Sequence, residues 1–335
     1  MIYHYGITQQ GTYHVEKNIV CQDAHNFKLI NENFAIAAVA DGLGSESHSD
    51  IASKIAVKES VEYCANNLKG NEDKEKILDI IKASFSLSLE TINKTANKNG
   101  DSLDEYDTTL VVAVYLNGNI YYGNAGDSGI VILNKDGTYE TLTEQQRDEE
   151  GRVFPLWFGE EKWVFGSKEN IASVLMATDG IYETLFPFLL KDSETPIYVA
   201  LAHYLMSEES LNFFKLKEEG VQQKIEQFIS NIPGSQVNDD KTILVMVDTN
   251  IVPNKLKDDY YKSPNWDELK KKHDEEYRKS AYPHLYNQQT QEEVTNNNKK
   301  TEEKREMTVE EMRTRVRKKL LSLIDKVLDE VDKED

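Results

Sequence analysis

Aspartates recur at the ends of short apolar runs in the first 250 residues. Asp41 follows the run FAIAAVA, Asp127 follows YYGNAG, Asp179 follows VLMAT, and Asn238-Asp239-Asp240 precedes KTILVMV. Each one alone is most simply a turn, because Asp beside Gly or Asn commonly ends a strand. Several carboxylates brought to one edge of a sheet, however, repel each other and need a positive charge. Together with Gln22-Asp23 upstream, they predict a cation site.

The type of ligand restricts the cation. Oxygen ligands without a motif Cys or His suit Mg²⁺ or Mn²⁺ better than zinc. Two such ions about 4 Å apart, bridged by one Asp, would activate a shared water for in-line attack on phosphorus. The chain shows no GxSxG, Walker A or GxGxxG motif, and Gly42-Leu43-Gly44 lacks the downstream Lys of a phosphate-binding loop. The sequence therefore favours metal-assisted chemistry over a nucleophilic Ser or Cys.

The elements that must position these residues are short strands alternating with helices. The apolar, β-rich runs predict strands over Phe34–Ala40, Thr108–Tyr115, Ile120–Asn124, Gly129–Leu133, Ala172–Ala177 and Thr242–Val247. Helical spacing covers Ser49–Leu68, Lys74–Asn97 and Pro196–Met206. The turns at 117–119 and 135–138 join consecutive strands as hairpins, so much of the sheet should be antiparallel. We expect an α+β layered domain rather than a doubly wound parallel one.

The first predicted helix has an apolar spacing that suggests one buried face. Its expected members are Ile51, Ile55, Ala56, Val61 and Leu68. Ser49 or Asp50 is the expected N-cap, because a short polar side chain there can accept a hydrogen bond from a free backbone N–H.

Composition and charge exclude several classes of protein. The chain has 335 residues and a net charge of −20, nearly all of it in the first 250 residues. Such a surface repels nucleic acid phosphates, so nucleic acid is not an expected partner. Its two cysteines, Cys21 and Cys64, are too few for a disulfide framework, which predicts a reducing compartment. No apolar stretch is long enough to span a bilayer, and we expect a cytoplasmic protein without a membrane partner.

The character of the chain changes after residue 250. Residues 1–250 read as one domain, 251–300 as a polar linker or partly packed excursion, and 301–335 as an amphipathic charged helix. Aromatic residues in 251–300 indicate that part of this segment packs on the preceding domain; they are Tyr260, Tyr261, Trp266, Tyr277, Tyr282 and Tyr286. Residues 308–331 carry apolar side chains at steps of three and four, which suits docking on their own core, self-association or a partner protein.

Five ordered motifs resemble one known family. They are YHVEKNIVCQDAH, VADGLGS, YDTTLVVAVYLNGNIYYGNAGDSG, VLMATDGIYETL and NDDKTILVMV. In sequence and spacing they are similar to the metal-dependent protein Ser/Thr phosphatases of type 2C, and most to the bacterial branch with a Cys-Gln-Asp-Ala motif near its start. The resemblance covers about residues 4–248 and implies a four-layer αββα sandwich. Two central antiparallel sheets would hold the metals in a cleft at one edge.

The resemblance also implies roles for individual residues. Asp41 would bridge two ions, the Gly42 carbonyl would ligate one of them, and Asp179 and Asp239 would complete the other. Asp23 would be a ligand or a nearby acceptor. Two further positions match the family by motif. Asp127 would help to hold a weaker third ion, and Asp240 would orient a neighbouring loop. Thr108 and Thr109 match a Thr-Thr strand start in the family.

The chain departs from the family pattern at four positions. Asn18 stands where an Arg usually binds substrate phosphate, which leaves His14 and Lys17 as the nearest substitutes. Gln22 replaces a frequent Glu, Leu43 replaces a His that can protonate the leaving group, and Gly129 replaces the Arg of a GDSR motif. Metal-bound water could take over the proton transfer.

Two functions follow from these observations. The retained carboxylates favour a phosphatase that hydrolyses phosphoserine or phosphothreonine with Mg²⁺ or Mn²⁺, with Asp41, Asp179 and Asp239 as the catalytic set. The missing Arg and the charged tail leave open a second function, a pseudophosphatase that binds a partner through its C-terminal helix.

Overall fold

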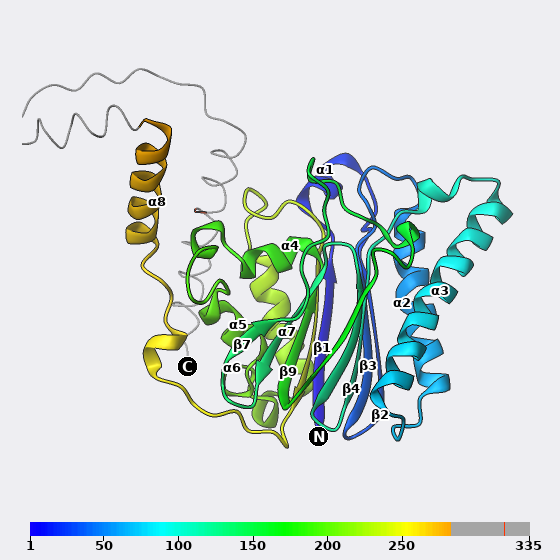
Figure 1. The fold of residues 1–335 in the computed structure, drawn as a ribbon, viewed down its shortest axis with the longest axis horizontal. Coiled ribbons are helices and arrows are strands. Elements are labelled where there is room, and N and C mark those ends of the chain that lie inside the picture. The colour runs from blue at the N-terminus through cyan, green and yellow to red at the C-terminus, as the bar shows by residue number, and fades with distance from the viewer. Residues whose placement is uncertain (283–317, 319–335) are drawn as a thin grey trace, which may run out of the picture.

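Two antiparallel sheets form the centre of the chain in a computed structural model, which describes residues 1–282 and Lys318. Within these residues the sheets have five strands each, in the orders β1-β10-β9-β6-β7 and β2-β3-β4-β5-β8 (Figure 1). The strands are β1 (Ile2–Gln9), β2 (Ala24–Asn31), β3 (Phe34–Ala40), β4 (Leu110–Leu116), β5 (Asn119–Ala125), β6 (Gly129–Asn134), β7 (Tyr139–Thr141), β8 (Val164–Glu169), β9 (Ile171–Ala177) and β10 (Lys241–Asp248).

Helices cover the outer face of each sheet. The helices are α1 (Thr12–Lys17), α2 (Ser49–Asn67), α3 (Lys74–Asn99), α4 (Asp179–Tyr182), α5 (Val199–Met206), α6 (Glu208–Leu211), α7 (Phe213–Ser230) and α8 (Trp266–Ala281). Helices α2 and α3 pack on the sheet of β2 to β5, whereas α5 and α7 pack on the sheet of β1, β9 and β10 (Figure 1). The predicted αββα order of layers is confirmed.

Three apolar cores separate these four layers. One lies between the sheets, and the other two lie between a sheet and its helices. Strand β3 shows how one sequence serves two cores, because Ala35, Ala37 and Val39 face the other sheet while Phe34 and Ile36 face the helices. Both faces of the central strands are therefore dry, which explains their continuous apolar sequences.

All six strands expected from the sequence form, within one or two residues of the predicted ends. The remaining four, β1, β2, β7 and β8, are the edge strands of the two sheets. An edge strand is covered on fewer sides, so its sequence carries polar residues, as in HNFKLIN of β2 and VFGSKE of β8. Both expected hairpins are present, and Asn117 and Gly118 adopt the positive φ values of 51° and 80° that such a tight turn needs.

Helix α2 buries most of the expected face: Ala56, Val61 and Leu68 are buried, and Ile51 and Ile55 pack against the same core. Ile51 and Ile55 are only partly buried, and the buried stripe consists mainly of small residues: Ser49, Ala52, Ser53, Ala56, Val57, Ser60, Val61 and Cys64. The expected N-cap is wrong, because His48 precedes the helix and no side chain caps it. Small residues let α2 lie close to both α3 and β3, so they fill most of its buried stripe.

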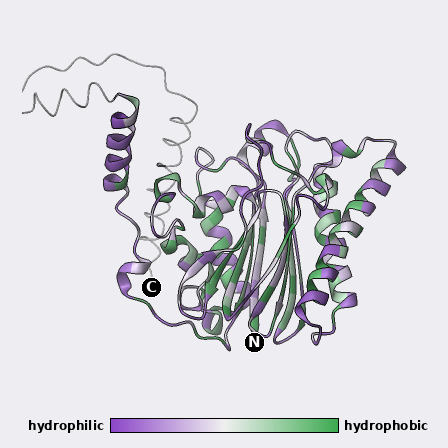
Figure 2. Cartoon of the chain, viewed as in Figure 1, coloured by the Kyte–Doolittle hydropathy of each residue, from purple (hydrophilic) through white to green (hydrophobic). Residues whose placement is uncertain are grey.

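The chain beyond β10 is partly packed on the domain. Trp266 is buried with its ring against Tyr198, and Tyr260 and Tyr261 pack on the same core. Tyr277, in contrast, is 42% exposed on α8, most of which is hydrophilic (Figure 2). Helix α8 lies within residues 251–300, for which the sequence predicts a polar linker or a partly packed excursion. Tyr286 and the helix predicted over residues 308–331, apart from Lys318, lie outside the described residues. Among the described helices, none is both long and apolar enough to cross a membrane.

The small-residue face of α2 leads to a stability prediction. Replacing Ala56, which is fully buried and whose carbonyl accepts hydrogen bonds from Ser60 and Ser88, by Leu should cost about 1–3 kcal/mol through overpacking. Urea unfolding measures the cost. Lys58→Leu, at an exposed position of the same helix, serves as the control and should change stability by less than about 0.5 kcal/mol. Equal effects of both substitutions would contradict the packing described here.

Candidate metal centre

Four aspartates predicted as cation ligands lie at the same end of the sandwich. Asp41 follows β3 and Asp127 follows β5 in one sheet, whereas Asp179 follows β9 and Asp239 precedes β10 in the other. Asp41, Asp127 and Asp179 each offer a carboxylate oxygen within 4.8 Å of the other two. The structure thus brings together residues that are 138 positions apart in the chain, from Asp41 to Asp179.

The backbone around Asp41 is fixed by the two threonines that follow η1 (Leu103–Tyr106) and Asp107. The Asp41 N–H donates to Thr109 Oγ1 at 2.9 Å, and Thr109 N–H donates to the Asp41 carbonyl at 2.8 Å. Thr108 Oγ1 donates to the same carbonyl at 3.0 Å. Thr109 Oγ1 also lies 3.0 Å from Ser128 Oγ, next to Asp127. The Thr-Thr pair therefore sets the positions of two of the aspartates.

Gly42 is required by close approach rather than by backbone angle. A Cβ at this position would lie 2.6 Å from the Ser49 carbonyl oxygen and 2.9 Å from that of Gln22. The Gly42 N–H donates to the latter oxygen at 3.1 Å. The missing side chain lets the end of β3 pass directly against the start of α2, which keeps Asp41 at the rim.

Asp23 lies beneath Asp41 and is almost fully buried. Thr178 Oγ1, one residue before Asp179, donates to Asp23 Oδ2 at 2.7 Å. Burial raises the pKa of Asp23 to about 7, and the charge of Asp240 adds to that effect. Asp23 therefore connects the two sheets through a hydrogen bond and adds negative charge below the other carboxylates.

The carboxylates destabilise one another's charged forms. Burial and then the charges of Asp179, Asp23, Asp127 and Asp239 raise the pKa of Asp41 well above its usual value. Burial and the same neighbours, with Glu183, also raise the pKa of Asp179. A nearby cation would relieve this repulsion.

The donor set fits a divalent cation that prefers oxygen. The cluster of described residues contains only carboxylates, and Asp127 Oδ1 is buried without a hydrogen-bond partner. Such an oxygen is costly unless something positive contacts it. Asp41, Asp127 and Asp179 could hold an ion directly, and the neighbouring Gly42 carbonyl and Asp239 carboxylate could complete its shell.

Asp239 lies at the edge of the cluster. Its side chain is 56% exposed and does not belong to the tight group of three, although its charge raises the pKa of both Asp41 and Asp179. Asp240 is buried instead, and its two oxygens accept hydrogen bonds from the N–H groups of Gly11 and Gln22, both at 2.6 Å. Asp240 ties the two N-terminal loops to the start of β10, which agrees with the loop-orienting role expected for it.

The two residues suggested for phosphate binding have different surroundings. His14 is buried in α1, with Nε2 3.7 Å from Asp239 Oδ1 and Nδ1 2.9 Å from Asp240 Oδ2, the latter without hydrogen-bond alignment. Lys17 is exposed, with Nζ 6.0 Å from the centre of the Tyr13 ring. His14 therefore reaches the edge of the cluster, whereas no interaction places Lys17 there.

Two departures from the family pattern have local structural reasons. Asn18 ends α1 in the left-handed conformation, with φ 55° and ψ 33°, which Asn adopts more readily than Arg does. At Gly129, a Cβ would lie 2.1 Å from the ring of Tyr182, so the Tyr182 ring occupies the space that a side chain would need. Tyr182 is held there by Thr141 and Thr143.

Sequence reasoning missed Arg147. Its guanidinium lies among Asp127, Asp179 and Glu183, with Nε 2.9 Å from Asp127 Oδ2 and Nη2 3.3 Å from Asp179 Oδ2. Arg147 sits in the polar segment EQQRDEEGR, where nothing in the spacing distinguishes it from a surface charge. Only the fold shows that this segment returns to the acidic cluster.

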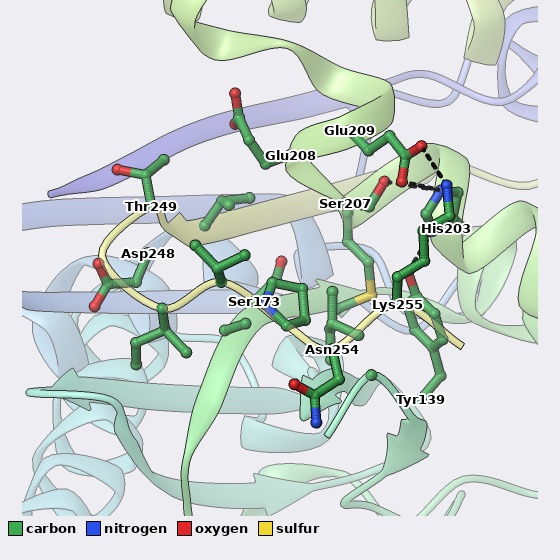
Figure 3. A pocket seen from close by; sticks show the side chains of 18 of the residues that line it. Tyr139, Ser173, His203, Ser207, Glu208, Glu209, Asp248, Thr249, Asn254 and Lys255 are labelled. Carbon is green, nitrogen blue, oxygen red and sulfur yellow. Dashed lines mark hydrogen bonds and ion pairs between the residues drawn. The ribbon is translucent and has the colours of Figure 1, made fainter. Parts of the chain in front are cut away.

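An apolar cavity of about 340 Å³ lies elsewhere, next to the opposite end of β10 (Figure 3). Asp248 and Thr249 line one part of it, and His203, Tyr139 and Lys255 line another. Asp239 and Asp248 stand at the two ends of the same strand, so the cavity is separate from the carboxylate cluster.

Comparisons with known proteins identify the family and the fold. Residues 10–229 match the family described as Protein phosphatase 2C. A bacterial serine phosphatase has a similar structure, with a TM-score of 0.52, 14% identity, and 76% of this chain and 100% of that chain covered. The Staphylococcus aureus serine/threonine phosphatase Stp1 gives 0.52, 15%, 74% and 95% for the same quantities. The Mycobacterium tuberculosis serine/threonine phosphatase PstP/Ppp gives 0.50, 17%, 73% and 98%. At these identities the likeness shows the fold, and no curated protein matches in sequence.

The clustered carboxylates predict how the metal-free protein responds to pH. Because the pKa of Asp23 is raised to about 7 and those of Asp41 and Asp179 are also raised, the folded state holds more protons than the unfolded state above pH 4. Stability should therefore fall as pH rises, and the melting temperature without metal should be higher at pH 6 than at pH 8 by about 3 °C or more. Thermal unfolding in chelator measures this.

Mn²⁺ should raise the melting temperature, and more at pH 8 than at pH 6, because its ligands must be deprotonated. Asp41→Asn should raise the metal-free melting temperature by removing repulsion and should abolish the Mn²⁺ effect. Asp192→Asn, at an exposed carboxylate, is the control and should behave as the unaltered protein. An Asp41→Asn protein that Mn²⁺ still stabilises fully would refute the assignment.

Proposed function

Because the chain belongs to the protein phosphatase 2C family, we propose that it is a metal-dependent phosphatase that hydrolyses phosphoserine and phosphothreonine in proteins. The observation that carries the proposal is the convergence of Asp41, Asp127 and Asp179, from both sheets, within 4.8 Å. Phosphate esters need charge neutralisation and a positioned water, and a cluster of carboxylate oxygens without a nucleophilic Ser or Cys suits that chemistry.

Asp41, Asp179 and Asp239 are the proposed catalytic set, and with the Gly42 carbonyl they would hold two divalent ions, Mg²⁺ or Mn²⁺. Such ions polarise a water for attack on phosphorus and offset the charge of the phosphoryl oxygens. A third ion near Asp127, as in related enzymes, remains part of the proposal. Support comes from the all-oxygen donor set and from the unpartnered Asp127 Oδ1.

The residues around this set act by positioning. Thr108 and Thr109 fix the backbone of Asp41, and Gly42 keeps that backbone at the rim. Asp23 is proposed as a ligand or a nearby acceptor, and its hydrogen bond from Thr178 holds it beneath Asp41.

His14 and Lys17 are the proposed contacts for substrate phosphate. Both belong to α1, which ends at Asn18. His14 is the better supported, because its Nε2 lies 3.7 Å from Asp239 Oδ1 and would carry a positive charge there when protonated. For Lys17 the support is its position one turn along the same helix.

A second candidate function is a pseudophosphatase that retains the fold and binds a partner. Two observations favour it: the usual phosphate-binding Arg is replaced by Asn18, and the chain continues past the family match into α8 and beyond. In this version residues 308–331 would contact the partner or a second copy.

We also propose that 1–250 is the catalytic unit, with 251–300 as its partly packed extension and 301–335 as a helix, in a cytoplasmic protein.

A phosphatase assay tests the two functions against each other. Purified full-length protein should release phosphate from p-nitrophenyl phosphate and from a phosphothreonine peptide only with Mn²⁺ or Mg²⁺. Asp41→Asn should lower kcat by at least about 100-fold, because the neutral amide binds an ion poorly. Asp192→Asn is the matched control and should keep full activity. Folded protein that binds Mn²⁺ yet shows no turnover would favour the pseudophosphatase.

A further inference from the structure

Arg147 is a cation built into the acidic cluster. Its Nε lies 2.9 Å and its Nη2 2.5 Å from Asp127 Oδ2, and Nη2 also lies 3.3 Å from Asp179 Oδ2 and 3.1 Å from Glu183 Oε1. One guanidinium thus contacts three carboxylates, two of which are proposed metal ligands. The side chain is 32% exposed, so solvent screens it only partly.

The backbone next to Arg147 is fixed to the strand end that carries Asp127. Gln146 N–H donates to the Gly126 carbonyl at 3.2 Å, and Gly126 N–H donates to Gln146 Oε1 at 3.0 Å. Gln145 Nε2 donates to the Asp127 carbonyl at 3.2 Å. These hydrogen bonds fix the segment that carries Arg147 to the end of β5, so the guanidinium is held at the cluster.

The two oxygens of Asp127 have different partners. Both Arg147 contacts go to Oδ2, whereas Oδ1 is buried and has no hydrogen-bond partner among the described residues. Arg147 therefore fixes the orientation of this carboxylate and leaves one oxygen available. The positive charge of Arg147 also lowers the pKa of Asp127, although burial raises it overall.

We propose that Arg147 is a positioning residue that serves as the tethered counter-cation of the metal centre. It neutralises Asp127, Asp179 and Glu183 when no divalent ion is bound, and it competes with the ions for Asp127 and Asp179 when they enter. The inference rests on the proposed metal-binding function. Arg147 would hold the carboxylates in place before an ion binds, and it would weaken ion binding by competing for the same oxygens.

Metal binding and unfolding together test this role. In Arg147→Gln, chelator-treated protein should melt at least about 4 °C below the unaltered protein, because three carboxylates lose their cation. Calorimetric titration should show Mn²⁺ binding at least about tenfold tighter, because one positive charge is absent. Saturating Mn²⁺ should then close most of the gap in melting temperature. Arg147→Lys, which retains the charge, should restore most of the metal-free stability.

The matched control is Arg152→Gln in the same segment. Arg152 is 73% exposed and pairs with Asp148 and Glu150, away from the cluster. This variant should leave Mn²⁺ affinity unchanged. If Arg147 served only the stability of the fold, Arg147→Gln would lower the melting temperature equally with and without Mn²⁺. That result, or unchanged or weaker Mn²⁺ binding in Arg147→Gln, would overturn this inference and leave the proposed function standing. If the unaltered protein bound no divalent ion, both the proposed function and the inference about Arg147 would fail.

Discussion

Repulsion among closely spaced carboxylates, some of them buried, is the constraint on which this structure depends. Asp23, Asp41, Asp127 and Asp179 lie at the same end of the sandwich, where the charges of Asp23, Asp127 and Asp179 help to raise the pKa of Asp41 and those of Asp23 and Asp127 help to raise the pKa of Asp179. A fold would not retain such an arrangement for stability alone, because a buried charge without a partner costs several kcal/mol. The rest of the domain provides the rigidity that holds them together: three dry cores, paired strand ends and threonine hydrogen bonds to the Asp41 backbone.

The central part of the fold could be predicted from the sequence because its strands are buried on both faces. Phe34–Ala40 is a strand with the predicted ends, and the hairpin at Asn117-Gly118 closes as its residues require. The edge strands β1 and β8 were not predicted, since half-covered strands carry polar residues that resemble loop sequence. On α2 the expected face is buried in part: Ile51 and Ile55 are only partly covered, and small residues, which give a weak apolar signal, form most of the buried stripe.

The candidate site was predictable to the extent that its residues belong to strand-end motifs. Asp41, Asp127 and Asp179 were expected and lie together, whereas Asp239 is at the margin and Lys17 has no contact with the group. Arg147 could not be found, because its role comes from a tertiary path in which residues 145–147 bond to 126–127. Two departures from the family motifs also have tertiary causes that the motifs do not show. Asn18 adopts a left-handed conformation, and the Tyr182 ring fills the space beside Gly129.

The central claim is that carboxylates from two sheets form one divalent cation site. Crystals grown with Mn²⁺ would test it most directly, through anomalous scattering that locates the ions without any assumption about ligands. We predict peaks in contact with Asp41 and Asp179, with Arg147 still beside Asp127 Oδ2. Mn²⁺ peaks only at other carboxylates, with none at Asp41, would contradict the claim.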